Sequence, residues 1–148
     1  FNLDERLWTI SGDHMKRGKS HAVPLSDAAL ALLSRAAAFR LPDSDVVFPG
    51  AAGKPMSDMT LLKVLRDMKE PYHVHGFRSA FTDWAANEGF ADAVVEAALA
   101  HKTPDAVQAA YRRTTYLGTP DQPGARVKLM DAWGRYCLGG LTDTGIVR

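Results

Sequence analysis

The stretch HGFRSAFTDWAANEG, residues 75–89, decides how the rest of the chain is interpreted. Three of its aromatic residues are spaced at i, i+4 and i+7, the spacing of one face of an α-helix: Phe77, Phe81 and Trp84. Gly89 is typical of the residue that ends a helix. The stretch therefore predicts a helix from about Gly76 to Asn87, with a histidine and an arginine at its beginning.

Further helices are expected before this one. Ser26 is a suitable N-cap for a helix from Asp27 to Phe39. A second helix is capped by Ser57 or Asp58 and broken by Pro71. Its apolar positions recur with helical spacing: Leu61, Leu62, Leu65 and Met68.

Helices are also expected after it. An Ala-rich amphipathic helix covers Ala91 to Leu99, and Thr103 caps a further helix with Pro104 at its first position, where the missing N–H costs nothing. A turn-rich insert, Thr119 to Gly124, then precedes a last helix. That helix carries Leu129, Met130, Trp133 and Cys137.

The beginning of the chain is β-like. Two short β-prone runs, Leu7 to Ile10 and His21 to Leu25, flank a polar stretch and predict a hairpin whose second strand is closed by Pro24. A third short strand is expected over Asp45–Phe48. The predicted fold is therefore mainly α with a small N-terminal β-hairpin, an α+β class.

The hairpin connection holds the densest group of basic residues in the chain, set against one acid, Asp13. Its members are His14, Lys16, Arg17, Lys19 and His21. The whole chain is close to neutral, with 18 basic and 17 acidic residues and a formal net charge of +1. Any nucleic-acid function must therefore depend on where the charges lie rather than on their sum.

The composition limits the classes of protein to which the chain can belong. The chain has 148 residues, of which 46% are hydrophobic and 24% charged, which excludes a disordered or low-complexity chain. Its apolar runs fall far short of the roughly 18 residues that cross a bilayer, so a soluble protein is expected. A single cysteine, Cys137, excludes a disulfide framework and suits a reducing compartment.

The chain is expected to form one unit, residues 1–138, followed by a flexible tail, residues 139–148. It begins Phe1-Asn2-Leu3, with neither a methionine nor a signal peptide, which suggests a fragment of a longer protein.

His75 and Arg78 are the first candidates for chemistry. Residues three apart share a helix face, so the imidazole and the guanidinium point the same way. They stand where free N–H groups and the positive end of the helix dipole favour an anion. The guanidinium matches two phosphate oxygens. The alternative is a surface histidine beside an arginine that covers Phe81.

The order of further motifs resembles the catalytic domain of the tyrosine recombinases, or phage integrases, and in particular its prophage-integrase branch. The run Ala97-Ala98-Leu99-Ala100-His101 is similar to the histidine motif of that family, and Tyr111 follows ten residues later. Met15-Lys16 before Val23-Pro24-Leu25 and Leu129-Met130 before Trp133 are further matches. The resemblance covers about residues 3–138.

The resemblance implies a role for each matching residue. Tyr111 is the nucleophile that forms a 3′-phosphotyrosyl link and expels a 5′-hydroxyl; Arg78 binds the phosphate, and His75 and His101 bond its oxygens or move protons. Lys16 is the general acid for the leaving oxygen. Weaker DNA contacts are expected from Arg17, Lys19, Arg112 and Arg113. Neither a metal nor another cofactor is implied.

Each role has an alternative. Tyr111 is in helical register with Val107 and Thr114, as an ordinary half-buried tyrosine would be, and Tyr116 is a competing nucleophile with a less suitable spacing. Lys19 competes with Lys16. His101 can also be a helix-end histidine that interacts with the dipole. His73 and His75 form an H-x-H pair, but no third metal ligand has a suitable spacing.

Two departures from the family pattern stand out. The first catalytic arginine of the family lies upstream of the hairpin, and Arg6 is too close to the first strand to replace it. The N-terminal DNA-clamping domains are also missing, so the chain by itself is expected to fold without cleaving DNA. The second departure is the insert Thr119 to Gly124, which lengthens the interval before the last helix.

The resemblance thus implies the catalytic part of a site-specific DNA recombinase that integrates or excises a mobile element. Its partners would be double-stranded DNA attachment sites and further protomers, as a tetramer on DNA, in a prokaryotic cytoplasm and without a membrane. The alternative is a DNA-binding remnant without chemistry. A metal phosphoesterase is disfavoured, because the sequence has no carboxylate–histidine cluster.

Overall fold

The computed structural model describes residues 1–16, 18–42, 44–50, 53–101, 115–119 and 121–139. The chain divides into two compact units. Unit 1 combines residues 1–30 with residues 84–148, and unit 2 comprises residues 31–83. The divisions fall inside two helices.

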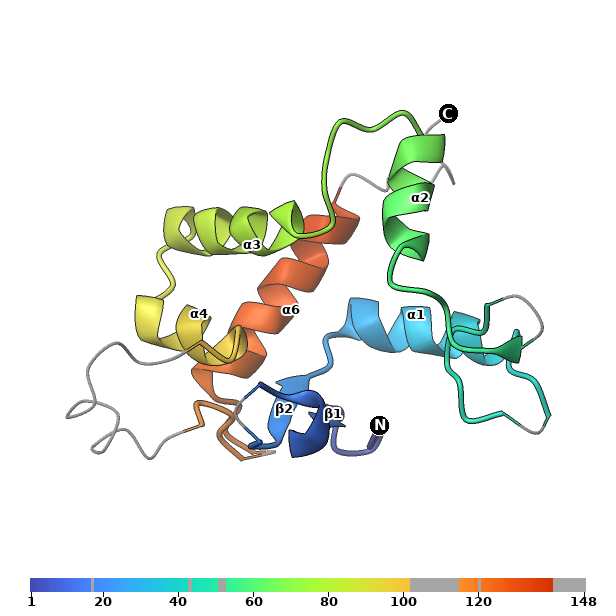
Figure 1. The fold of residues 1–148 in the computed structure, drawn as a ribbon. Helices are drawn as coiled ribbons and strands as arrows, with labels where there is room; N and C mark the ends of the chain where they lie inside the picture. Colours follow the sequence, from blue (N-terminus) through green and yellow to red (C-terminus); the bar gives the residue numbers. More distant parts are fainter. Residues whose placement is uncertain (17, 43, 51–52, 102–114, 120, 140–148) are drawn as a thin grey trace. The chain divides into compact units, whose positions relative to one another are not determined.

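The predicted hairpin opens unit 1 (Figure 1). Strands β1 (Leu7–Ile10) and β2 (His21–Pro24) are antiparallel, and their register runs from Leu7 opposite Pro24 to Ile10 opposite His21. Pro24 ends the ladder, where its missing N–H removes no interior hydrogen bond. A short 3-10 turn, η1 (Gly12–His14), starts the connection between the strands.

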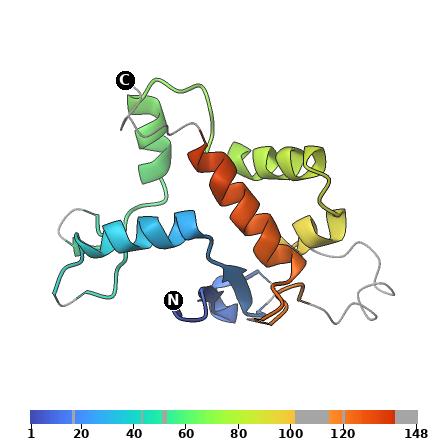
Figure 2. The ribbon, with the colours of Figure 1, turned by 180° about the vertical axis from the view of Figure 1, so that it is seen from behind.

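Two helices complete the core of unit 1. Helix α6 (Ala125–Leu138) packs against α4 (Asp92–Ala98) and against β2, and both ribbon views show it beside them (Figures 1 and 2). Leu129 of α6 is completely buried. Val94 and Val95 of α4 are also buried, which is the expected outcome for an Ala/Val-rich amphipathic helix.

Aromatic side chains join α6 to the helix predicted over residues 76–87. That helix, α3 (Gly76–Asn87), has the predicted bounds. The ring of Trp84 lies 5.0 Å from that of Trp133 and 5.5 Å from that of Tyr136, centroid to centroid. Gly89 ends α3 with a left-handed φ of +78°, and the N–H of Phe90 returns to the carbonyl of Ala85 at 2.9 Å.

The predicted cap of α1 (Asp27–Ala37) is confirmed. The hydroxyl of Ser26 accepts a hydrogen bond from the N–H of Ala29 at 3.3 Å, and its carbonyl accepts one from Leu30 at 2.9 Å. The helix ends two residues before Phe39, the predicted end.

Unit 2 departs from the sequence expectations at two places. Helix α2 (Thr60–Asp67) begins after Met59, so neither Ser57 nor Asp58 is its cap; the Ser57 hydroxyl instead accepts from the N–H of Met59 in the preceding turn. The strand predicted over Asp45–Phe48 is not formed either. In the described part of the chain the only sheet is the two-stranded β1–β2 hairpin, so this run has no neighbouring strand to pair with.

Two expectations cannot be compared with the structure. The helix predicted after Thr103 and the tail 140–148 lie outside the described residues. Among the helices that are described, none is long and apolar enough to span a membrane.

Gly134 of α6 is buried close to Ser26 and Ala28, at the beginning of α1. A Cβ at this position would lie 2.6 Å from the Ser26 hydroxyl and 3.2 Å from the Cβ of Ala28. We expect Gly134→Ala to lower the free energy of unfolding by about 1–3 kcal/mol, although alanine is the better helix former. Chemical denaturation measures this, with Lys128→Ala on the exposed side of α6 as the near-neutral control. A stabilised Gly134→Ala variant would contradict the close approach.

Candidate active site

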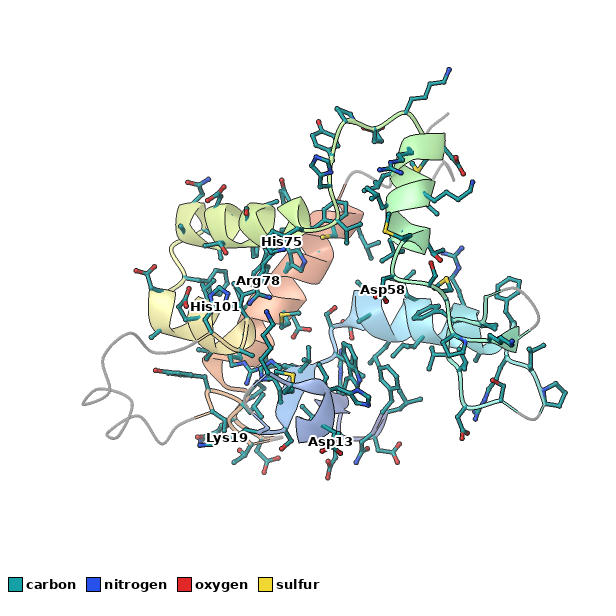
Figure 3. All side chains as sticks on the ribbon, in the orientation of Figure 1. Asp13, Lys19, Asp58, His75, Arg78 and His101 are labelled. Carbon is teal, nitrogen blue, oxygen red and sulfur yellow. The ribbon has the colours of Figure 1, made fainter. Side chains whose placement is uncertain are left out.

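His75 and Arg78 lie together at the N-terminal end of α3 (Figure 3). The N–H of Arg78 donates to the carbonyl of His75 at 3.1 Å, so the two residues bracket one turn. His75 is exposed and Arg78 is half-buried. An imidazole and a guanidinium on one turn provide several N–H donors toward a single anion.

The backbone amides at this helix end do not add to those donors. The N–H groups of Gly76, Phe77 and Arg78 already donate to the carbonyls of the three residues that precede the helix, at 2.8, 3.3 and 3.1 Å. The expectation that free helix amides bind the anion is therefore wrong for these three positions, because tight turns before α3 occupy them. Recognition of an anion here falls to the two side chains and to the helix dipole.

Lys16 lies in a turn of the β1–β2 connection. The N–H of Gly18 donates to the carbonyl of Met15 at 2.9 Å, and Gly18 has the left-handed φ of +63°. Lys16 is the first residue within this turn and is exposed. Lys19 is exposed too, and Figure 3 labels it with Asp13 in the same connection. Both lysines are accessible to a polyanion, so the choice between them stays open.

His101 follows the end of α4. Ala100 takes a left-handed φ of +54°, and the N–H of His101 returns to the carbonyl of Glu96 at 2.9 Å. The same glutamate accepts from the ring, with 2.9 Å between Nδ1 and Oε2. When the imidazole is neutral, this bond keeps its proton on Nδ1 and leaves the lone pair on Nε2. Glu96 thus orients the ring.

The predicted site residues fall into two described groups. His75 and Arg78 belong to unit 2, whereas Lys16, Lys19 and His101 belong to unit 1. The remaining predicted residues lie outside the described part of the chain: Arg17, Tyr111, Arg112 and Arg113. The competing tyrosine, Tyr116, is described and half-buried, and its carbonyl accepts from the N–H of Arg126 at 2.9 Å.

Arg6 makes structural contacts with the start of α1. Its guanidinium forms an ion pair with Asp27, and its Nε lies 3.4 Å from the carbonyl oxygen of Leu25. These contacts join the residue before β1 to the start of α1.

In the described part of the chain, no group of three or more histidine, cysteine, aspartate or glutamate residues is arranged to hold a metal ion.

The sequence analysis missed a pair formed by the half-buried His21 and the buried Arg126. Arg126, in the first turn of α6, is only 4% exposed. Its Nη2 donates to the carbonyl of Ala22 at 2.6 Å and lies 3.4 Å from His21 Nε2; its Nη1 donates to the carbonyl of Thr115 at 3.2 Å. His21 Nε2 also lies 3.2 Å from the carbonyl oxygen of Ala98.

The tautomer of His21 follows from these contacts. A carbonyl only accepts and a guanidinium only donates, so Nε2 must carry its proton to bond Ala98 and must lack it to bond Arg126. Arg126 Nη2 already has a closer acceptor in Ala22. We therefore assign the proton to Nε2, which satisfies both carbonyls.

A periodicity signal for Arg126 was present in the sequence. Arg126 precedes Leu129, Met130 and Trp133 by three, four and seven residues, so it stands in the apolar stripe of the last helix. A charged residue at a core position needs compensating hydrogen bonds. The sequence placed His21 both among the basic residues of the connection and at the start of the second β-prone run; it is the first residue of β2 and half-buried.

Burial changes the titration of the pair. Desolvation is the largest cause that lowers the pKa of His21, and the charge of Arg126 adds to it, although the bond to Ala98 acts in the opposite direction. Desolvation also lowers the pKa of Arg126. Among the described residues no carboxylate forms an ion pair with this guanidinium, and its Nε has no hydrogen-bond partner. His21 is therefore the neutral neighbour of a buried cation.

Comparison with known proteins gives the class of this chain. Residues 1–117 match the phage integrase family. The chain is 36% identical over 121 residues to the prophage integrase IntA of Escherichia coli strain K12, a match that covers 79% of this chain and 29% of that relative. The chain therefore belongs to the phage integrase family, as its motif order predicts.

Two further relatives agree. The integrase of Shigella phage Sf6 and the prophage integrase IntS of Escherichia coli strain K12 are each 33% identical over 121 residues, with 78% of this chain and 31% of each relative covered. The chain thus spans about a third of the length of the curated relatives it matches. No solved structure matches it significantly.

The lowered pKa of His21 predicts a pH effect on stability. Between the ordinary value of about 6.5 and the lowered one, the unfolded chain binds a proton that the folded chain does not. The free energy of unfolding should therefore fall as the pH is lowered through about 6.5. The His21→Gln variant should lose this component, whereas His14→Gln, in the exposed turn, should keep it. Denaturation midpoints across pH measure both, and an unaltered pH profile in His21→Gln would refute the assignment.

Proposed function

We propose that this chain is the catalytic part of a site-specific DNA recombinase of the tyrosine type, within residues 1–138. The family supplies the class of reaction, and the observation that carries the proposal is the His75–Arg78 turn at the beginning of α3. DNA attachment sites would be its substrate, and further protomers on DNA would be its partners.

The proposed reaction balances without an external energy source. The Tyr111 oxygen attacks a backbone phosphorus, a 3′-phosphotyrosyl bond forms, and the bond from phosphorus to the 5′-oxygen breaks. The phenol proton leaves to a base, for which the lone pair on His101 Nε2 is suitable, and Lys16 donates a proton to the departing 5′-oxygen. Attack by a different 5′-hydroxyl reverses these steps and completes strand exchange.

Charge stabilisation is assigned to side chains. Negative charge grows on the phosphoryl oxygens in the transition state, and N–H donors of fixed geometry lower its energy. Arg78 can bind both non-bridging oxygens at once, and His75 can donate to one of them. Since the amides at the start of α3 are occupied, losing Arg78 removes the main donor of this turn.

The second candidate is a DNA-binding protein of the same family that lacks chemistry. It is kept because the chain has a formal net charge of only +1, whereas DNA binding usually requires several phosphate contacts. It predicts DNA binding that weakens steeply with salt and no covalent product. The first prediction below separates the two.

Tyr111→Phe should abolish covalent attachment to DNA and leave non-covalent binding nearly unchanged, because only the attacking oxygen is removed. The substrate is a nicked duplex that covers the boundary of the genetic element carrying the gene, and the protein is expressed from the complete gene. Denaturing gels detect the covalent complex. Tyr116→Phe is the matched control and should still be trapped. Trapping of the Tyr111→Phe protein would refute the assignment, and no trapping of the unsubstituted protein would favour the binding protein.

Arg78→Ala should slow the same covalent step by about 3–5 kcal/mol of activation free energy, because a charge-assisted, two-pronged donor is lost. Arg78→Lys keeps the charge but not the planar fork, so it should recover only part of the rate. Single-turnover trapping at saturating protein measures both, with Arg66→Ala on exposed α2 as the control. Equal rates for Arg78→Ala and the unsubstituted protein would contradict phosphate binding by Arg78.

A further inference from the structure

The His21–Arg126 pair contacts three segments that the proposed reaction needs. His21 begins β2, directly after the turn that carries Lys16. Ala98, whose carbonyl His21 bonds, is the last residue of α4 and precedes His101 by three positions. Thr115, whose carbonyl Arg126 bonds, follows the segment 102–114 that contains Tyr111.

We infer that His21 and Arg126 are positioning residues, which hold both ends of the segment bearing Tyr111 to strand β2. His21 holds the entry through Ala98, and Arg126 holds the exit through Thr115. The inference rests on the proposed role of Tyr111. It adds a function to two residues that have no part in the proposed reaction steps.

Several hydrogen bonds hold the chain directly after the segment that bears Tyr111. Arg126 bonds Thr115 through its side chain and Tyr116 through its backbone N–H, which donates to the Tyr116 carbonyl at 2.9 Å. The N–H of Gly124 bonds the carbonyl of Leu117 at 2.8 Å. Three consecutive carbonyls after the segment are therefore fixed from the beginning of α6.

Burial makes these contacts hard to replace. The guanidinium of Arg126 is removed from water, and the described residues around it offer backbone carbonyls in place of a carboxylate. Breaking one of these bonds leaves a buried charge with fewer acceptors, which is costly. The arrangement therefore resists movement of Thr115 away from β2.

Position matters because strand transfer requires a nucleophile aligned with the phosphorus and with the leaving oxygen. A displacement of about 1 Å can slow a reaction on the order of a hundredfold without any loss of binding. Fixing both ends of a segment limits where its central residue can go. The same pair fixes the start of β2. The turn that carries Lys16 and the segment that carries Tyr111 are therefore both held relative to this strand.

The test compares four variants. His21→Leu removes the donor to Ala98, and His21→Gln keeps an N–H at a similar reach. Arg126→Gln removes the charge and most of the donors. Val95→Ala is the control, because it destabilises the buried face of α4 without touching the pair.

The first measurement is hydrogen exchange of the protein without DNA. His21→Leu should speed exchange about tenfold in peptides around residues 96–101, and Arg126→Gln should do so around residues 115–119, while exchange in β1 stays unchanged. His21→Gln should restore the slow rates. Unchanged exchange in both loss variants would overturn the inference, whatever the chemistry of the protein.

The second measurement is covalent trapping on the nicked duplex, at a temperature where all variants are folded. His21→Leu and Arg126→Gln should slow trapping by roughly ten- to a hundredfold at saturating protein, with an unchanged DNA dissociation constant. His21→Gln should recover the rate, and Val95→Ala should match the unsubstituted protein. Equal slowing in Val95→Ala would show a merely structural role and overturn the inference. If Tyr111→Phe were still trapped, the proposed function itself would fail, which separates the two failures.

Discussion

A buried guanidinium without a carboxylate partner among the described residues is the constraint on which unit 1 depends. Arg126 can be accommodated at 4% exposure only if backbone carbonyls accept its hydrogens. Those carbonyls come from β2 and from the chain that leads into α6, at Ala22 and Thr115. One desolvated charge therefore fixes where the hairpin meets the last helix, and the packing of Leu129 one turn later follows from that placement.

The sequence predicted most of unit 1. The hairpin, the bounds of α3, the Ser26 cap and the last helix all follow from local rules: β-propensity, helical spacing and capping chemistry. The errors have physical causes. The Asp45–Phe48 run has the composition of a strand, but a strand also needs a partner, and local composition does not show whether one is available. The cap of α2 was misplaced because Ser57 bonds within a preceding turn instead of starting the helix.

The candidate site was predictable in its residue types and less so in its supporting contacts. Family motifs pointed to His75, Arg78 and His101, and family membership is now supported by relatives. Three contacts were beyond a motif: the occupied amides before α3, the orienting bond from Glu96 and the His21–Arg126 pair. The first two arise from the geometry of local turns, and only the third brings together residues that are far apart in the sequence. Of the residues that make these contacts, only Arg126 could have been detected from the sequence, because it is a charged residue in the apolar stripe of the last helix.

The insert before α6 has a use in experiments. Gly118 has a φ of +76°, and a side chain at Gly118 or Gly124 would collide with the backbone of the facing strand of the loop. The two sides of the loop therefore lie in close contact at its base, and Asp121 at its far end is exposed. A fluorophore or spin label attached at residue 121 would lie four residues before the start of α6. Its signal would report whether the beginning of α6 moves when DNA is added, without a substitution in the helix itself.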